Sequence, residues 1–202
     1  MSRHPLLLCI ALALSGSPAV AQPAADTVRI TQNLATCLVR TRGRIAEAYV
    51  AGGTPDARSP DYQRLLETRC LPGAGAPPLD PRLVRGAIYE ELYARDFANG
   101  GPTSFADVPP LALPNGGANP PLEGALLRFG ECVVRADPGD SRALLSAAFQ
   151  SPGERASIEA LTPHLSPCMQ DGLTVTFSAP ILRGVVAEAL YKLSRASAAP
   201  RA

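Results

Sequence analysis

The chain has 202 residues, of which 46% are hydrophobic and 18% are charged, and its formal net charge at pH 7 is +1. This near-neutral balance argues against the strongly basic surface that nucleic acids or acidic membranes attract. No run of apolar residues approaches the ~20 that a membrane-spanning helix needs. We therefore expect no membrane span, and from the charge balance we expect no nucleic-acid partner.

The first 21 residues predict a cleavable secretory signal peptide. Arg3 supplies the basic start, an apolar stretch follows at 6–14, and 19–21 read Ala-Val-Ala, a small-x-small cleavage site. We expect cleavage near Ala21 and a mature chain in the periplasm or outside the cell. Cys9 offers the alternative of a lipid anchor, but the bulky Leu8 before it argues against lipidation.

The chain contains an internal repeat. The run 37–40, Cys-Leu-Val-Arg, returns at 132–135 as Cys-Val-Val-Arg, and the Arg-Gly pair of 85–86, with the Glu, Leu and Tyr that follow it, returns at 183–191. Such self-similarity predicts two copies of one structural unit. The expected divisions are a signal peptide over 1–21, repeat 1 over 22–98, a Pro/Gly-rich linker over 99–121, repeat 2 over 122–195 and a flexible tail over 196–202.

The spacing of apolar residues predicts three helices in each copy. In the first copy one helix begins at Asp26 and ends at Gly52, a second begins at Ser59, and a third begins at Asp80. The second copy repeats this plan, but Pro-Gly at 138–139 interrupts its first helix. We therefore expect an all-α protein of two tandem three-helix repeats, packed as a pseudo-symmetric pair.

Four cysteines remain after cleavage, and an even number in an exported chain indicates two disulfides. Four cysteines allow three pairings, and the symmetry of the repeat does not choose among them. Because units of this size often need a covalent link, we expect one disulfide within each repeat, Cys37 with Cys70 and Cys132 with Cys168. A metal site is the alternative, but the CxxC spacing and nearby histidine of zinc sites are missing.

The third helix of each copy has an apolar side and, opposite to it, a polar stripe. A glycine lies on the polar side in both copies, at 86 and 184. Glycine inside a helix costs ~1 kcal/mol relative to alanine, so we expect another backbone to approach closely there. The residues assigned to the stripe, including one arginine from the first helix of each copy, are Arg40, Glu90, Tyr93, Arg135, Glu188 and Tyr191.

This stripe allows a structural and a functional interpretation. In the structural one, Arg40 pairs with Glu90 and Arg135 pairs with Glu188, each inside its own repeat and half-buried, with a tyrosine hydroxyl completing the pair. In the functional one, a glutamate lies in a cleft between the copies, and its neighbours tune its pKa for acid–base chemistry. Packing alone accounts for a duplicated element, which favours the structural interpretation.

No other motif indicates catalysis, a cofactor or a metal ion. The chain lacks GxSxG, a glycine-rich phosphate loop, CxxCH and HExxH, and His164 is the only histidine that remains after cleavage. We therefore assign no catalytic, cofactor-binding or metal-binding residue. The expected role is a non-enzymatic interaction or scaffold module with an unknown protein partner. The alternatives are a small ligand bound in the crevice between the repeats and, third, a glutamate-dependent hydrolase or isomerase.

The second copy carries a resemblance to other proteins. The runs 131–137, Glu-Cys-Val-Val-Arg-Ala-Asp, and 141–145, Ser-Arg-Ala-Leu-Leu, together with Leu-Arg-Gly at 182–184 and Ala-Glu-Ala-Leu-Tyr at 187–191, resemble a group of small exported two-repeat proteins of Gram-negative bacteria. The likeness is looser in the first copy, where Thr36 replaces the glutamate before the cysteine. The resemblance implies a periplasmic location and implies no activity, cofactor or catalytic residue.

Overall fold

The computed structural model describes residues 25–52, 55–67, 69–71, 77–114, 119–170 and 176–199. The expected signal peptide and its cleavage site near Ala21 lie outside these residues.

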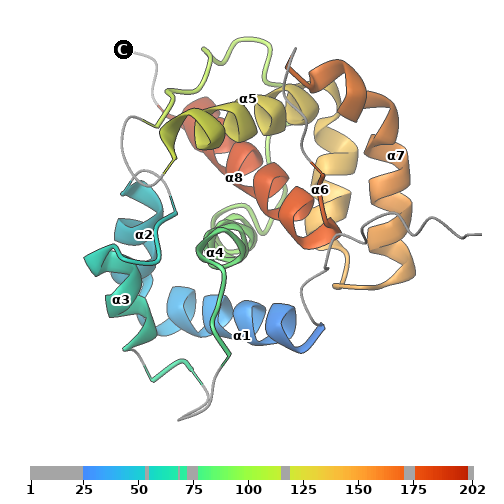
Figure 1. Cartoon of the computed structure of the whole chain (residues 1–202). Coiled ribbons are helices and arrows are strands. Elements are labelled where there is room, and N and C mark those ends of the chain that lie inside the picture. Colours follow the sequence, from blue (N-terminus) through green and yellow to red (C-terminus); the bar gives the residue numbers. More distant parts are fainter. Residues whose placement is uncertain are drawn as a thin grey trace, which may run out of the picture.

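The described residues form eight α-helices and no strand, which confirms the predicted all-α class. Figure 1 shows α4 nearly end-on in the middle of the molecule, with α8 crossing it. The helices are α1 (Ala25–Thr41), α2 (Gly43–Ala51), α3 (Pro60–Leu66), α4 (Pro81–Asp96), α5 (Pro120–Ala136), α6 (Pro138–Ser146), α7 (Pro152–Cys168) and α8 (Ala179–Ala198).

Each half of the chain contains one disulfide. Cys37 on α1 bonds to Cys70, shortly after α3, and the two Cα atoms are 5.5 Å apart. Cys132 on α5 bonds to Cys168 at the end of α7, with the Cα atoms 5.6 Å apart. Both predicted pairings are confirmed, and neither disulfide joins the first half to the second.

The described part of the first half contains four helices rather than the expected three, because the helix predicted from Asp26 to Gly52 is broken. At Arg42 the backbone has φ −140° and ψ 36°, so α1 ends at Thr41 and α2 begins at Gly43. Glycine is a poor helix former, and it stands where Pro138 and Gly139 break the second copy. The break turns α2 so that its apolar side joins the same core as α1.

Capping residues begin the later helices as the sequence predicts. The side chain of Ser59 accepts a hydrogen bond from the Tyr62 N–H at the start of α3, and Asp80 accepts one from the Arg82 N–H at the start of α4. A proline follows each cap in the first turn. There its missing N–H costs nothing, because the first four N–H groups of a helix have no partner within it.

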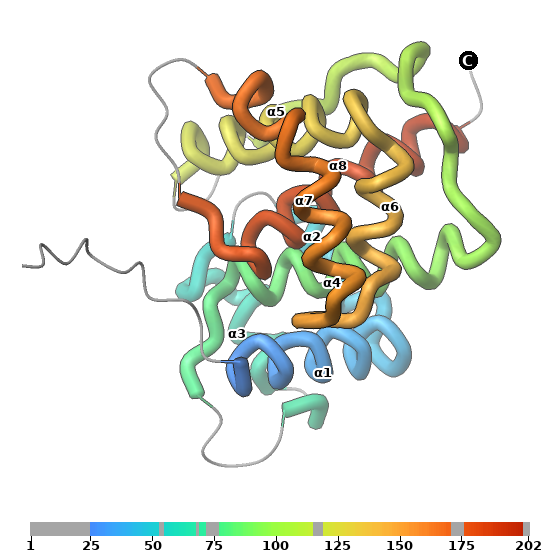
Figure 2. Tube along the Cα trace, turned by 90° about the vertical axis from the view of Figure 1, so that its right-hand side faces the viewer, coloured from blue at the N-terminus to red at the C-terminus, as the bar shows by residue number. Residues whose placement is uncertain are grey.

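Helices α4 and α8 form the centre of the fold and connect two hydrophobic cores. The apolar side of α4, with Val84, Ile88 and Leu92, lies in the first core against α1 and α2. The apolar side of α8, with Leu182 and Leu190, lies in the second core against α5. In Figure 2 α1 lies below this pair and α5 above it. The opposite sides of α4 and α8 therefore face each other.

The described part of the expected linker is packed against the second half. It runs up the side of the molecule in light green in Figure 2. The side chains of Phe105, Val108 and Leu111 are buried. The Arg135 guanidinium donates to the carbonyls of Phe105 and Val108, and the Leu111 N–H donates to the Glu131 carboxylate. The Pro/Gly-rich composition predicted a linker and did not predict this packing, which places three apolar side chains of the segment in the second core.

Candidate functional site

The two glycines of the polar stripes meet where α4 crosses α8. A Cβ atom placed on Gly86 would lie 2.5 Å from the Gly184 Cα, and one placed on Gly184 would lie 3.0 Å from the Gly86 Cα. Contacts this short with backbone cannot be relieved by rotating a side chain. The prediction that a backbone approaches both glycines is confirmed, and each glycine is the close neighbour of the other.

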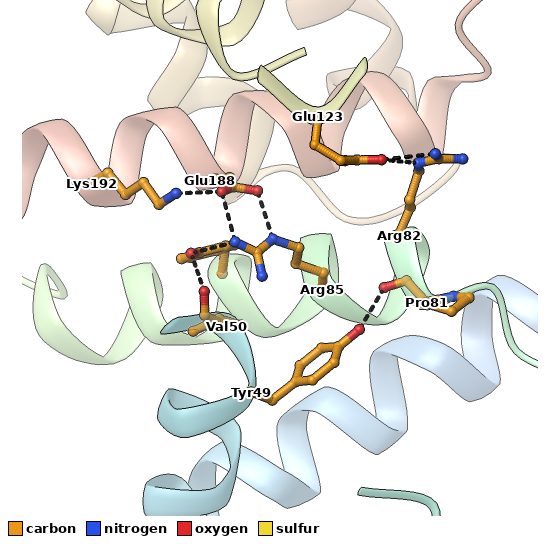
Figure 3. A network of polar contacts seen from close by, with 9 residues as sticks. Tyr49, Val50, Pro81, Arg82, Arg85, Glu123, Glu188 and Lys192 are labelled. Carbon is orange, nitrogen blue, oxygen red and sulfur yellow. Dashed lines mark hydrogen bonds and ion pairs between the residues drawn. The ribbon is translucent and has the colours of Figure 1, made fainter. Parts of the chain in front are cut away.

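Two arginine–glutamate ion pairs flank this crossing. Arg85 of α4 donates from Nε and Nη2 to the two carboxylate oxygens of Glu188, both at 3.0 Å (Figure 3). Arg183 of α8 donates from Nε to Glu90 at 2.7 Å. Each arginine precedes the crossing glycine of its own helix and pairs with the glutamate of the other helix. The two halves are therefore joined by reciprocal ion pairs.

The expected pairs within each repeat are wrong. Glu90 and Glu188 pair across the interface, because the polar sides of α4 and α8 face each other and not α1 or α5. Arg40 is exposed on α1. Arg135 pairs with Glu131 on its own helix, with 2.8 Å between Nη2 and Oε1, and its remaining donors hold the segment before α5.

The two tyrosines of the stripe have different surroundings. The Tyr191 hydroxyl donates to the Asp96 carboxylate at 2.9 Å. The Tyr93 hydroxyl is buried and has no hydrogen-bond partner within the described residues, while its ring stacks on Phe97 with 5.1 Å between centroids. Neither hydroxyl completes an arginine–glutamate pair, so this part of the structural interpretation is also wrong.

The Arg85–Glu188 pair has a second cation beside it. The Lys192 ammonium lies 2.5 Å from Glu188 Oε1 (Figure 3), and the Arg85 guanidinium lies over the Tyr89 ring, 5.2 Å from its centroid. Burial alone raises the pKa of a carboxyl, but Arg85 and Lys192 together hold the pKa of Glu188 below its ordinary value. Glu188 therefore stays ionised.

The Arg183–Glu90 pair has a second carboxylate beside it. Arg183 also contacts Glu154 of α7, with 3.3 Å between Nη1 and Oε1, and donates to the Leu145 carbonyl. Burial raises the pKa of Glu90 above its ordinary value, and Arg183 offsets this only in part, since Glu154 and Glu91 add like charge. The cavity at this pair has a volume of about 10 Å³, no more than a single water needs.

A groove of about 770 Å³ lies beside the Arg85–Glu188 pair, between α2, α4, α8 and the residues before 115. We call it the inter-half groove. A smaller cavity of about 40 Å³, which the Glu188 carboxylate lines, adjoins it and shares Arg85 and Pro114 with it. Leu113 at the edge of the groove is 50% exposed. Other side chains that line the groove are Val50, Tyr89, Leu92, Tyr191, Lys192 and Arg195.

Within the described residues, no group of three or more His, Cys, Asp or Glu side chains could hold a metal ion. His164 lies 4.0 Å from Asp137, a contact that is an ion pair only when the imidazole is protonated. None of the described helices is both long enough and apolar enough to cross a membrane.

Sequence reasoning missed several residues of this site. Arg85 and Arg183 stand in the duplicated string, directly before the glycines, and this placement was the available signal. Tyr89 and Lys192 carried no signal, because neither belongs to a motif and Lys192 is unmatched in the first copy. Only the crossing of α4 and α8 brings these residues together.

Comparison of the chain with protein-family models, with curated proteins and with solved structures found no significant match.

Proposed function

We propose that this chain is a non-enzymatic binding protein of the periplasm that holds a small ligand in the inter-half groove. The observation that carries the proposal is the groove itself. Its volume of about 770 Å³ falls within the range of roughly 300–1,000 Å³ that is usual for ligand sites. Its wall combines apolar and aromatic side chains with a few charged groups, the mixture by which such sites bind and orient ligands.

The glutamates support binding better than acid–base chemistry. A general base works best with a pKa near the operating pH, whereas Arg85 and Lys192 lower the pKa of Glu188. Glu90 has a raised pKa, but it faces a cavity of about 10 Å³ that leaves no room for a substrate. The hydrolase or isomerase alternative thus lacks a glutamate that is both accessible and suitably basic.

The proposed architecture is a pair of repeats related by pseudo-symmetry, with the site between them. The reciprocal pairs Arg85–Glu188 and Arg183–Glu90, and the two glycines that meet between them, support this arrangement. Interfaces between domains are places where ligand pockets often form. The position of the groove between the halves supports the alternative in which a small ligand binds in the crevice between the repeats.

A periplasmic location follows from the sequence and agrees with the chemistry of the cysteines. The signal-like segment predicts export, and two disulfides are typical of an oxidising compartment. The resemblance to small exported proteins of Gram-negative bacteria points to the same location.

The test is a thermal-shift screen of the mature chain against pooled organic acids, amino acids, nucleosides and sugars. A ligand at 100 times its Kd adds about 2.7 kcal/mol, which for a chain of this size raises Tm by roughly 5–10 °C. A shift that is lost in Ala51→Trp and kept in Ala48→Trp supports the proposal. Both alanines are exposed on α2, and only Ala51 lines the groove.

A screen without any hit, or hits that Ala51→Trp leaves unchanged, would count against a ligand in the groove. In that case the interaction or scaffold role becomes the better proposal. Co-purification of a protein partner that Leu113→Ser releases would then support that role, because Leu113 is a large and exposed apolar side chain.

A further inference from the structure

The charged groups around the inter-half groove do not balance. Three of its cations, Arg85, Lys192 and Arg195, line the groove together with a single carboxylate, Glu47. The carboxylates behind them are each shared by two cations. Glu188 contacts both Arg85 and Lys192.

The same sharing occurs at the other end of the groove. Asp96 contacts both Arg95 and Arg195, and Arg95 also contacts Glu47. With Arg85 and Lys192 included, four cations face the three carboxylates Glu47, Asp96 and Glu188. The groove therefore has one positive charge more than its own carboxylates neutralise.

Two of these cations have donors to spare. Arg195 has a side chain that is 63% exposed and contacts Asp96 at 3.5 Å, and no other contact of its guanidinium occurs within the described residues. Its remaining N–H groups can donate two parallel hydrogen bonds to a carboxylate. Lys192 uses one of its three N–H donors on Glu188. The two residues are three apart on α8 and so lie on one side of it.

The half-buried Tyr191 ring borders the groove next to these cations, and the buried Tyr89 ring packs against it. The rings of Tyr89 and Tyr191 have centroids 5.7 Å apart and are tilted by 48°. The Tyr89 hydroxyl donates to the Val50 carbonyl, and the Tyr191 hydroxyl donates to Asp96. Tyr89 is only 2% exposed and Arg85 covers its ring, so a ligand in the groove meets the half-buried ring of Tyr191. Because the Tyr191 hydroxyl is occupied, this residue offers a ring surface rather than a hydrogen bond, and aromatic partners pack well on such a surface.

Given the proposed function, on which this step rests, we infer that the ligand of the groove is an aromatic monoanion. Its ring packs against Tyr191, and its carboxylate binds Lys192 and Arg195. One negative charge satisfies the groove, and a short chain between ring and carboxylate spans the two features.

Isothermal titration calorimetry of the mature chain with three matched probes tests this inference. The probes are 3-phenylpropionate, the neutral 3-phenylpropanol and the cationic 3-phenylpropylamine. We expect the anion to bind at least about 10-fold more tightly than the alcohol, since a hydrogen bond to a charged group contributes this much, and we expect the amine not to bind.

Variants of Lys192 and Arg195 test whether these two side chains bind the carboxylate of the ligand. Lys192→Met and Arg195→Gln should each weaken binding of 3-phenylpropionate about 10-fold and leave binding of 3-phenylpropanol unchanged. Arg155→Gln, which removes the same charge from an exposed position on α7, should bind both probes like the unaltered chain. This control separates a local contact from an effect of net charge.

Three results would overturn the inference. They are equal affinity for the anion and the alcohol, an unchanged affinity in both Lys192→Met and Arg195→Gln, or no binding of the anion at all. If the alcohol or the amine binds and Ala51→Trp abolishes that binding, the groove remains a ligand site and only the inferred ligand class is wrong. If the broad screen also finds nothing, the proposed function falls with it.

Discussion

The two ends of the α4–α8 crossing contain the same duplicated residues but have different surroundings. At each end an arginine next to a glycine pairs with a glutamate of the other helix, with Nε···O distances of 3.0 Å for Arg85 and Glu188 and 2.7 Å for Arg183 and Glu90. One pair lies beside a groove of about 770 Å³, and the other faces a cavity of about 10 Å³.

The third charged residue also differs between the two ends. Lys192 adds a cation to the groove end, and Glu154 adds a carboxylate to the closed end. Neither residue is duplicated: Lys192 corresponds to Ala94 in the first copy, and Glu154 lies outside the repeated runs. The duplicated residues join the two halves, and these unduplicated neighbours set the charge at each end.

Removal of one arginine should affect the closed end most. Arg183→Met leaves Glu90 and Glu154 together without a cation, and breaking a buried ion pair in this way costs about 3–5 kcal/mol. Arg85→Met should cost at least ~1 kcal/mol less, because Lys192 still neutralises Glu188. Urea denaturation of both variants measures the two costs. An equal or larger loss for Arg85→Met would contradict the assignment of Lys192 as the compensating charge.

Removal of one glutamate should reverse this order. Glu188→Gln leaves the buried Arg85 next to Lys192 without a carboxylate, with an expected cost of about 2–3 kcal/mol. Glu90→Gln should stay within about 1 kcal/mol of the unaltered chain, because Arg183 keeps Glu154 as a partner and one like charge is removed. The same denaturation measurements provide the result. If Glu90→Gln proves the more damaging variant, the two ends have been assigned the wrong way round.

Changes at the crossing should disturb both ends equally. Gly86→Ala places a methyl group 2.5 Å from the Gly184 Cα, and the overpacking should cost about 1–2 kcal/mol after the gain in helix propensity. Gly124→Ala is a matched control inside α5, since its Cβ would meet only the Leu113 side chain, at 3.6 Å. It should be neutral or slightly stabilising. A neutral Gly86→Ala would show that the helices can separate at no cost.

The two ends should also differ in how their contribution to stability depends on pH, which is the smallest of the expected effects. Glu90 has a raised pKa, so its contribution to stability is complete below the ordinary glutamate pKa of ~4.3 and is lost as the pH rises through the raised value. Glu188 has a lowered pKa, so its contribution is complete above the ordinary value and is lost as the pH falls through the lowered one.

Tm measurements from pH 4 to pH 8 test these opposite signs. Relative to the unaltered chain, Glu90→Gln should become more stable as the pH rises. Glu188→Gln should be less stable than the unaltered chain, and this difference in Tm should not shrink as the pH rises. Arg155→Gln serves as a control, and its difference in Tm should not depend on pH. A difference for Glu90→Gln that is constant or moves the other way would contradict the raised pKa.

Local sequence determined much of the fold. The caps at Ser59 and Asp80, the apolar spacing and the four cysteines predicted helices and disulfides, because each depends on residues near one another in the chain or on the small size of the halves. The repeated glycine also predicted the close contact at Gly86, since a costly residue kept in both copies indicates a packing requirement. The break at Arg42 was missed because Gly43 alone is a weak signal.

Only the tertiary structure decided which carboxylate each arginine meets. Sequence spacing places Glu90 and Glu188 on the polar sides of their helices, but it does not say which sides face each other. Because α4 crosses α8 with these sides facing each other, each arginine meets the glutamate of the other half. The groove depends on the same crossing, because its residues come from α2, α4, α8 and the segment before α5, which lie far apart along the chain. Contacts of this range are set by how the two cores pack together, and no local pattern encodes them.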